Sequence, residues 1–320
     1  MLNAPKFNYI ITIHNKEDLI EEVLKCVLMC CRDNSHVYPV LDGCTDNTEK
    51  IVDGIINRSS GVPITKVYTP DVHELLSINA GLKAAFQEGE GFNIILQDDV
   101  LLLDTTLEDK VHRLYQWAGP KLGYVSFRMG ANFTKDSAKS QNPVPYTDYV
   151  ENAYGHGIRN AKMLPLGHLA YRTVPIKSPV CLPFKIVREV GMFNEKLAPY
   201  GHDDPELAIR IIKAGYHNAV FSLKFESDVD WGGTRTTAHP NLNPIIERNM
   251  NYIRNRYSEE LTDICLNLQP FEIVKVDGMA TPAEEKESKK EWHSKVKPRR
   301  FYLFKSLCVK FVNSFTKKRC

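Results

Sequence analysis

Residues 92–100 have the sequence FNIILQDDV. An apolar run of β-strand type at 92–96 is followed directly by the polar residues Gln97, Asp98 and Asp99. Two adjacent carboxylates repel each other unless a cation or hydrogen bonds compensate, and proteins hold Mg²⁺ or Mn²⁺ with one or two carboxylates plus substrate phosphates. The stretch therefore predicts a buried strand that ends at a cation site, although Asp98 could instead cap a helix.

The first hundred residues alternate apolar strand-like runs with segments of helical period, a pattern typical of βαβ units that carry a mostly parallel sheet. We expect strands at residues 7–13, 36–41, 64–68 and 92–96, helices at 15–28 with Asn15 as N-cap, 45–56 and 75–86, and strand carboxyl ends at 12–15, 42–46, 69–71 and 97–100. In an open α/β sheet that edge is where ligands bind.

The middle of the chain has a weaker pattern. Residues 130–180 are rich in Asn, Pro, Tyr, Gly and His without a clear period, so we expect loops that cover the sheet. A strand at 179–182 and a helix at 185–190 should follow. A further helix should open at Asp203, with Pro205 in its first turn, and close at Gly215.

The C-terminal part has a different composition. Residues 281–298 are rich in Glu, Lys, Ser and Pro, which is typical of a linker. We therefore expect one α/β domain at 1–280, a charged linker at 281–300 and a basic amphipathic tail at 301–320.

The charge is uneven along the chain. The 320 residues carry a formal net charge of +2, but residues 286–320 hold twelve Lys or Arg against two Glu, a balance of +10, which leaves −8 on residues 1–285. An acidic body argues against a nucleic-acid-binding protein. The sequence shows no secretory signal and no apolar stretch of about 20 residues, and its eight cysteines follow no framework spacing, so we expect a cytoplasmic protein.

Two more acidic clusters accompany the first. Asp42 to Asp46 (DGCTD) follows a predicted strand and is either a turn with an N-cap or a carboxylate site for the N–H groups of a nucleobase. Asp203 and Asp204 precede Pro205, where Asp204 could be an N-cap or a general base. Local sequence alone favours the structural reading of both.

The clusters and their neighbours, taken in order, resemble family 2 glycosyltransferases, which are inverting nucleotide-sugar enzymes of the GT-A fold. The resemblance covers residues 7–260, and five motifs in sequence make it specific. It rests on residues 9–15 (YIITIHN), 40–48 (VLDGCTDNT), 79–81 (NAG), 95–100 (ILQDDV), and, as one motif, 190–195 (VGMFNE) with 201–210 (GHDDPELAIR).

The resemblance implies a mostly parallel open sheet flanked by helices, a nucleotide-sugar donor and a Mn²⁺ or Mg²⁺ cofactor. It implies nucleotide-sugar contacts from Thr12, His14, Asn15, Asp42, Asn79, Gln97 and Asp98, a metal on Asp99, and Asp204 as catalytic base beside Asp203. Asp230 or His239 would replace the metal-ligating His that the family often has after that helix. The implied reaction is a single displacement with inversion onto an acceptor hydroxyl of a glycan or a lipid-linked glycan.

The chain departs from the family pattern at His14, where a stacking Tyr is usual, at Gln97, where Asp is usual, and at Asp230. These departures leave open a second hypothesis, a non-catalytic protein that binds a nucleotide sugar or glycan in the same cleft. Retention of Asp42, Asp99 and Asp204 favours catalysis, because a binder needs no base. A dehydrogenase is excluded, since no G-x-G-x-x-G follows the first strand. A sugar nucleotidyltransferase is excluded because no Gly-rich loop bearing Arg and Lys occurs there.

The tail at 301–320 combines a wide apolar face with a polar face and a flank of Lys317, Lys318 and Arg319. This pattern resembles an interfacial helix, since polybasic residues near an anionic leaflet contribute about 1 kcal/mol each. We therefore expect peripheral binding to the cytoplasmic face of an anionic membrane, and a lipid-linked acceptor. A helix docked on the protein's own surface is the alternative.

Overall fold

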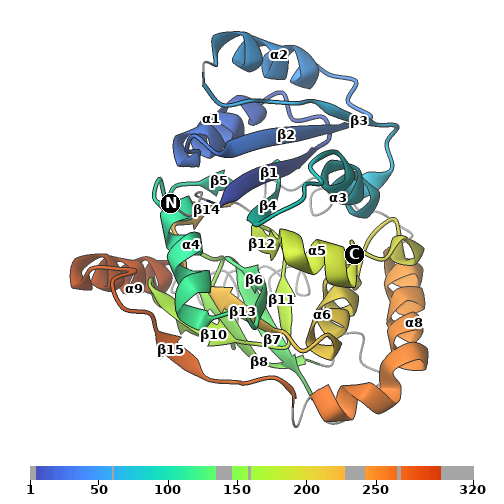
Figure 1. Ribbon diagram of the computed structural model, residues 1–320, viewed down its shortest axis with the longest axis vertical. Helices are drawn as coiled ribbons and strands as arrows, with labels where there is room; N and C mark the ends of the chain where they lie inside the picture. Colours follow the sequence, from blue (N-terminus) through green and yellow to red (C-terminus); the bar gives the residue numbers. More distant parts are fainter. Residues whose placement is uncertain are drawn as a thin grey trace, which may run out of the picture.

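The computed structural model describes residues 5–59, 61–134, 146–157, 160–227, 242–264 and 268–296 (Figure 1). Its centre is a nine-stranded sheet in which strands β12 and β10 run against the direction of the others, so the sheet is mostly parallel. In spatial order the strands are β15 (Ile273–Lys275), β10 (His168–Tyr171), β13 (His217–Phe221), β6 (Leu122–Ser126), β12 (Val180–Pro183), β4 (Gly91–Gln97), β1 (Lys6–Ile13), β2 (Ser35–Asp42) and β3 (Val67–Thr69).

The half of the sheet built by the first hundred residues confirms the βαβ pattern. Strands β4, β1, β2 and β3 are parallel neighbours, and the register pairs Thr12 with both Val40 and Gln97. β3 begins later than expected, because Ile64 makes only an isolated bridge to Val37 before the pairing starts at Val67.

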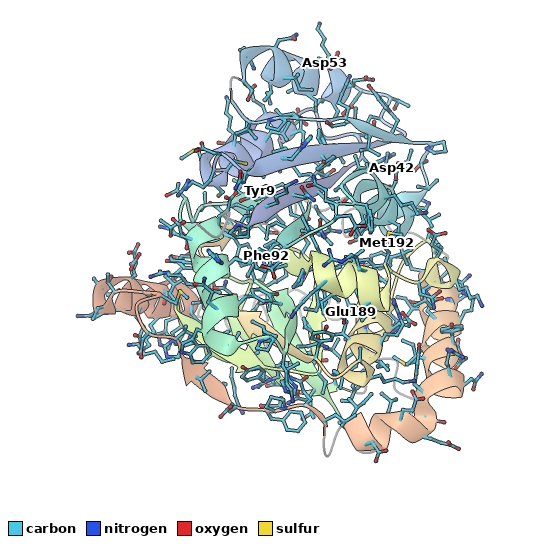
Figure 2. The ribbon with its side chains drawn as sticks, viewed as in Figure 1. Tyr9, Asp42, Asp53, Phe92, Glu189 and Met192 are labelled. Atoms are coloured by element: carbon cyan, nitrogen blue, oxygen red, sulfur yellow. The ribbon has the colours of Figure 1, made fainter. Side chains whose placement is uncertain are left out.

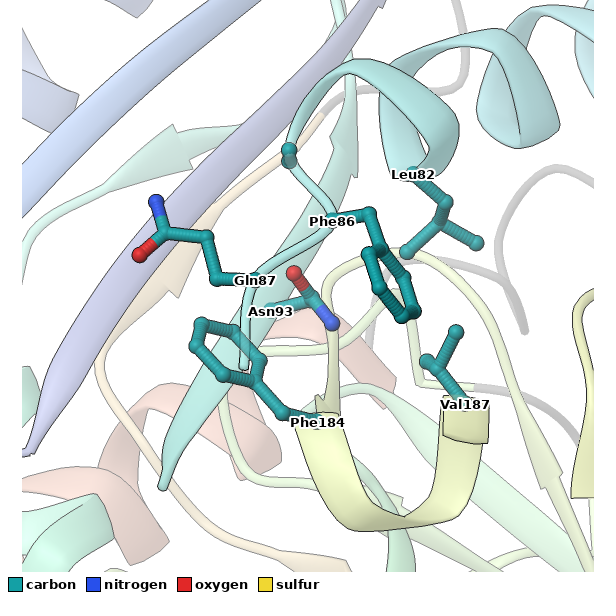
Figure 3. A pocket seen from close by; sticks show the side chains of 7 residues that line it. Leu82, Phe86, Gln87, Asn93, Phe184 and Val187 are labelled. Atoms are coloured by element: carbon teal, nitrogen blue, oxygen red, sulfur yellow. The ribbon is translucent and has the colours of Figure 1, made fainter. Parts of the chain in front are cut away.

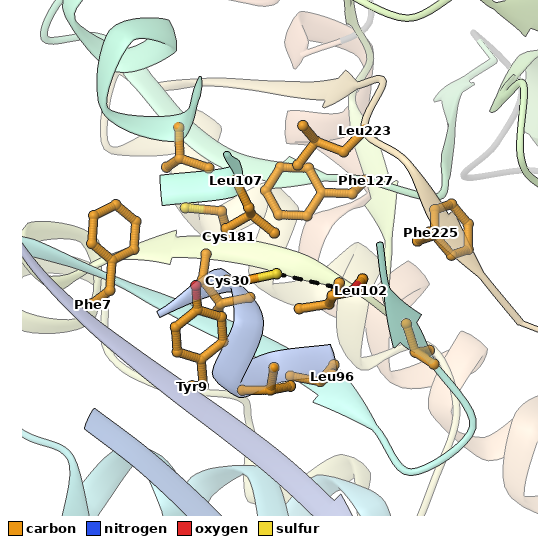
Figure 4. Close-up of a cluster of buried hydrophobic side chains, with 14 of the residues drawn as sticks. Phe7, Tyr9, Cys30, Leu96, Leu102, Leu107, Phe127, Cys181, Leu223 and Phe225 are labelled. Carbon is orange, nitrogen blue, oxygen red and sulfur yellow. Dashed lines mark hydrogen bonds between the residues drawn. The ribbon is translucent and has the colours of Figure 1, made fainter. Parts of the chain in front are cut away.

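Helices cover both faces of the sheet. Strand β1 shows why, because Tyr9, Ile11 and Ile13 point into one apolar core while Ile10 points into another. The first core (Figure 4) packs against α1 (Ile20–Cys30), α2 (Thr48–Arg58) and α4 (Leu107–Ala118), and the second against α3 (His73–Ala84), α5 (Phe184–Val190) and α6 (Asp203–Lys213). A strand buried on both faces is mostly apolar in sequence, and in β1 only Asn8 and Thr12 interrupt the apolar residues of 7–13.

Residues 130–180 were expected to be loops, and for the described part of this segment that is wrong. They contribute β10 and a second sheet of order β11 (Val174–Ile176), β7 (Met129–Phe133), β8 (Tyr146–Asn152) and β9 (Lys162–Leu164). All five residues of β7 are buried, so no alternation of polar and apolar residues marks the strand. A further short pair joins β5 (Leu101–Leu102) to β14 (Phe225–Glu226).

The charged segment expected to be a linker forms helix α9 (Pro282–Val296). Its start is a capping box, in which the Thr281 N–H donates to Glu284 Oε2 at 2.7 Å and Glu284 N–H donates back to Thr281 Oγ1 at 3.3 Å. Trp292 is buried and anchors the helix to the body. Residues 281–284 (TPAE) match the sequence pattern of a capping box, but the charged composition of the segment favoured a linker.

Helix α8 (Leu242–Asp263) buries Ile253, Tyr257 and Leu261 against Ile209 and Ile212 of α6. Within the described residues, no helix has the length and apolar character needed to cross a bilayer. The amphipathic tail expected at 301–320 lies outside the described part of the chain.

Candidate active site

The predicted site residues gather at the carboxyl ends of the parallel strands. His14 follows β1, Asp42 ends β2, and Asp98 and Asp99 follow β4. Because β1 is hydrogen-bonded to both β2 and β4, the polar residues after these three strands meet at one sheet edge. Figure 2 labels Asp42 at this edge.

The turn after β1 is tied to the turn after β2. His14 Nδ1 lies 2.6 Å from the Asp42 carbonyl oxygen, and Asn15 Oδ1 accepts the main-chain N–H of Thr45 at 2.7 Å. Asn15 has a φ of 45° and was expected to cap the first helix, which is wrong because α1 begins at Ile20. Its short polar side chain suits the left-handed conformation and fixes the neighbouring turn instead.

Asp42 is buried and its Oδ1 accepts two hydrogen bonds, from Thr69 Oγ1 at 2.7 Å and from the Val72 N–H at 2.8 Å. Gly43 is required beside it, since its φ is +57° and a Cβ there would lie 2.5 Å from Asp71 Cβ. His14, Asp42 and Asp71 each place one ligand-type atom within 4.8 Å of the others. Hydrogen bonds already engage Asp42 and His14, so this group fits polar ligand recognition better than a cation.

Asp98 is bound by residues of the turn that follows β1. The His14 N–H donates to Asp98 Oδ2 at 2.9 Å, and Lys16 Nζ lies 3.5 Å from Asp98 Oδ1. Burial raises the pKa of Asp98 to about 6, against the opposing effect of Lys16. Gln97 contributes its main-chain N–H, which donates to Ser178 Oγ at 2.9 Å.

Asp99 has a buried carboxylate oxygen, Oδ1, with no hydrogen-bond partner among the described residues. A buried oxygen of this kind is costly unless a cation or donor completes it. The predicted divalent cation would do so, and carboxylate oxygen is the ligand type that Mn²⁺ and Mg²⁺ prefer. The residue therefore fits the predicted metal.

Asp203 and Asp204 open helix α6, and both are buried. Asp204 accepts hydrogen bonds from Tyr124 Oη at 2.8 Å and from the Lys177 N–H at 3.2 Å, while the Lys177 ammonium binds Asp203. Burial raises the pKa of Asp204 to about 7, although Lys177 opposes the rise. Asp204 is therefore no N-cap, but a buried carboxyl group that titrates near neutral pH.

Glu74 of helix α3 joins the two acidic pairs. Its Oε1 lies 3.5 Å from the Lys177 ammonium. Burial raises the pKa of Glu74 to about 7; Lys177 opposes this rise, and the charges of Asp203 and Asp99 contribute to it. The strand-end carboxylates and the helix-start carboxylates therefore belong to one electrostatic cluster.

Asn79 has a structural role in addition to the predicted one. Its Nδ2 donates to the Phe193 carbonyl at 2.8 Å, and its Oδ1 accepts the Phe193 N–H at 3.1 Å. Nδ2 also reaches Glu195 Oε1 at 3.2 Å, at the start of the short helix η1 (Glu195–Leu197). Contact between Asn79 and a nucleotide stays a prediction.

Sequence reasoning missed Glu74, Lys177, Tyr124 and Lys16. No motif marks them, because each reaches the cluster from a different element only after the chain has folded. Asp230 and His239, the predicted last metal ligands, lie outside the described residues. Thr12 lies at the end of β1 as expected, eight per cent exposed and paired in register with Gln97.

A small pocket of about 10 Å³ lies apart from this cluster (Figure 3). It is lined by the end of α3, the start of α5 and Asn93 of β4, and Phe86, Phe184 and Val187 give it an apolar wall. β4 begins at Gly91, so this pocket lies towards the opposite edge of the sheet from Asp98 and Asp99. It is too small for a nucleotide.

Comparison with known proteins agrees with this geometry. The sequence profile described as glycosyl transferase family 2 matches residues 9–159. The mannosyltransferase PcManGT from Pyrobaculum calidifontis, solved with GDP-Man and Mn²⁺, aligns with a TM-score of 0.51 and 17% identity over 98% of this chain and 88% of that chain. No curated protein matches by sequence.

Two structures of S. aureus TarS also align. The 1-349 fragment gives a TM-score of 0.50 and 14% identity over 91% of this chain and 71% of that chain. The longer TarS structure aligns with a TM-score of 0.46 and 18% identity over 69% of this chain. The alignment covers only 36% of that TarS chain. Residues 9–159, just under half of the chain, are therefore similar to glycosyl transferase family 2, and the alignment with PcManGT shows a shared fold.

Proposed function

We propose that this protein transfers a sugar from a nucleoside-diphosphate donor to an acceptor hydroxyl with inversion, with Asp204 as general base and Asp99 as a ligand of Mn²⁺ or Mg²⁺. The observation that carries the proposal is the single buried cluster of Asp99, Glu74, Lys177, Asp203 and Asp204 at the ligand-binding edge of the sheet. A structural salt bridge would not need this excess of carboxylates.

The charges in the reaction match the two parts of the cluster. A sugar that leaves a diphosphate develops positive charge at the anomeric carbon and negative charge on the departing phosphate. A divalent cation on Asp99 would stabilise that negative charge. Asp204 would accept the proton of the attacking hydroxyl, and a base with a pKa of about 7 suits this task near neutral pH.

The polar groups at the ends of β1 and β2 would bind the nucleotide. Asp42 is buried and fixed by two donors, so it can present its second oxygen to the N–H groups of a base. His14 and Thr12 would lie beside the base, and Asp98 with Gln97 near the ribose, with Asn15 and Asn79 supporting the binding loops. UDP-sugars are the first donors to test, and GDP-mannose joins them because the similar PcManGT was solved with it.

Turnover of a donor panel tests the proposal. The full chain is incubated with UDP-glucose, UDP-N-acetylglucosamine or GDP-mannose and MnCl₂, and released nucleoside diphosphate is measured. Asp204→Asn should bind nucleotide normally yet lose about 10²- to 10⁴-fold in rate, the usual contribution of a general base. Asp53→Asn, on the outside of α2, is the matched control and should keep full activity.

Full activity of Asp204→Asn would refute the assignment of the base. Tight nucleotide binding by the unaltered protein without turnover of any donor would favour the non-catalytic binding protein instead.

The acceptor proposal rests on the sequence alone. We propose that residues 301–320 bind an anionic membrane surface and bring the site to a lipid-linked glycan. Deletion of residues 297–320 should abolish pelleting with vesicles of phosphatidylglycerol and phosphatidylcholine. Unchanged pelleting of the shortened protein would refute this proposal.

A further inference from the structure

Lys177 places its ammonium inside the acidic cluster, where its side chain is only 7% exposed. The ammonium binds Asp203 and lies 3.5 Å from Glu74 Oε1, and it lies 5.0 Å from the centre of the Phe193 ring. The main-chain N–H of the same residue donates to Asp204 Oδ2. One residue therefore contacts both members of the acidic pair at the start of α6.

We propose that Lys177 is a positioning residue for the general base, which orients Asp204 through its main-chain N–H and balances the charge of the cluster through its buried ammonium. This inference rests on the proposed function of Asp204. It assigns Lys177 no contact with substrate, so removal of its charge should change the titration of Asp204 rather than remove a reacting group.

The surroundings of Asp204 show why a cation is needed. The titratable groups that face it or its neighbour Asp203 are Tyr124 from β6, Tyr146 from β8, Glu74 from α3, Tyr200 and His202 from the segment before α6, and Lys177. Among these groups Lys177 alone carries a fixed positive charge. Burial raises the pKa of Asp204, Lys177 lowers it, and Asp203 and Glu74 raise it again.

Lys177 and Glu74 change the pKa of Asp204 in opposite directions. Substitutions of these two residues therefore distinguish an electrostatic role from a merely structural one. Lys177→Met removes the cation at similar side-chain length and should move the titration midpoint of Asp204 upward by at least about one pH unit. Glu74→Gln removes a neighbouring negative charge and should move the midpoint to lower pH. Lys177→Arg keeps the charge and should leave the midpoint near its original value.

The measurement is the ¹³C chemical shift of the Asp204 carboxyl group during a pH titration of the full chain labelled at aspartate Cγ. Loss of the signal in Asp204→Asn assigns it. Lys110→Met is the matched control, because Lys110 also forms a shielded ion pair, at 2.6 Å from Asp104, but outside the cluster. It should leave the Asp204 titration unchanged.

A folded Lys177→Met protein whose Asp204 titrates as before would overturn the proposal. Should that variant fail to fold, Lys177→Gln, which removes the charge but keeps a polar side chain, decides, and an unchanged midpoint there overturns the proposal as well. The titration needs no sugar donor, so its result can be told apart from a test of the proposed function. The proposed function fails separately if Asp204→Asn turns over donors at the original rate.

Discussion

Tyr124 on strand β6 donates a 2.8 Å hydrogen bond from its phenol to Oδ1 of Asp204 in the first turn of helix α6. The two residues are 80 positions apart, and the bond fixes the helix start to the middle of the sheet. A hydrogen bond to the ionised carboxylate lowers its pKa and opposes the effect of burial. Tyr124 therefore holds one oxygen of the Asp204 carboxylate, while the Lys177 N–H holds the other.

Tyr124→Phe should lower activity at low pH if Asp204 is the general base, as proposed. The substitution removes a donor to the carboxylate, so the pKa of Asp204 rises above about 7 and a smaller fraction is ionised below that pH. Donor turnover at pH 6 should fall about fivefold, the equivalent of about 1 kcal/mol, and recover at pH 9. The measurement is the rate of nucleoside diphosphate release against pH.

The matched control is Tyr115→Phe, which removes a buried phenol that donates to the Gly123 carbonyl at 2.7 Å instead of to a carboxylate. Its pH profile should overlay that of the original protein. Equal losses at pH 6 and pH 9 in Tyr124→Phe would show a general packing defect and contradict the prediction.

Asp99→Asn should abolish coupling between divalent metal and nucleotide. Its Oδ1 has no hydrogen-bond partner among the described residues, so a cation is the expected partner. The affinity for UDP or GDP in 1 mM MnCl₂ should fall at least about tenfold, or about 1.4 kcal/mol. Isothermal titration calorimetry measures it, with Asp53→Asn as control.

The same variant should unfold in metal-free buffer at an equal or higher urea concentration than the original protein. Removal of an uncompensated buried charge relieves a cost that binding sites often carry. A marked loss of stability without metal would instead assign Asp99 a structural role.

Gly81→Ala should destabilise the fold by about 1–3 kcal/mol through overpacking. A Cβ at this position would lie 2.4 Å from Ile10 Cγ2 and 2.9 Å from Val40 Cγ2. Helix α3 would therefore have to move away from strands β1 and β2. Urea unfolding measures the change. Gly54→Ala in helix α2 meets only Arg58 Nη2 at 3.9 Å and should stabilise by about 0.5–1 kcal/mol. Destabilisation of similar size in both variants would refute this account of α3 packing.

Trp292→Ala should cost about 3–5 kcal/mol of unfolding free energy, as expected for a large buried aromatic side chain. Trp292 is 7% exposed and fixes helix α9 to the body, whereas Trp117 on α4 is 47% exposed. Trp117→Ala should therefore change stability by less than about 1 kcal/mol. Near-equal urea midpoints for the two variants would restore the earlier prediction that this segment is a linker.

The parallel half of the sheet and the acidic positions at its carboxyl edge could be predicted from the sequence. Apolar runs such as Ile94 to Leu96 specify buried strands, because burial on both faces favours apolar side chains and admits a polar one such as Asn93 only with hydrogen-bond partners. The order of strands and helices then placed Asp42, Asp98 and Asp99 at one edge, because parallel strands share the position of their carboxyl ends. These inferences use only local patterns and chain direction.

The surroundings of Asp204, the proposed base, could not be predicted from the sequence. Lys177, Glu74 and Tyr124 come from a loop, a helix and a strand, and they meet Asp204 because the sheet and its helices pack together. The pKa of Asp204 depends on that burial and on those neighbours. Local sequence encodes periodicity and turn chemistry, whereas desolvation and charge balance arise from contacts between residues far apart in the chain.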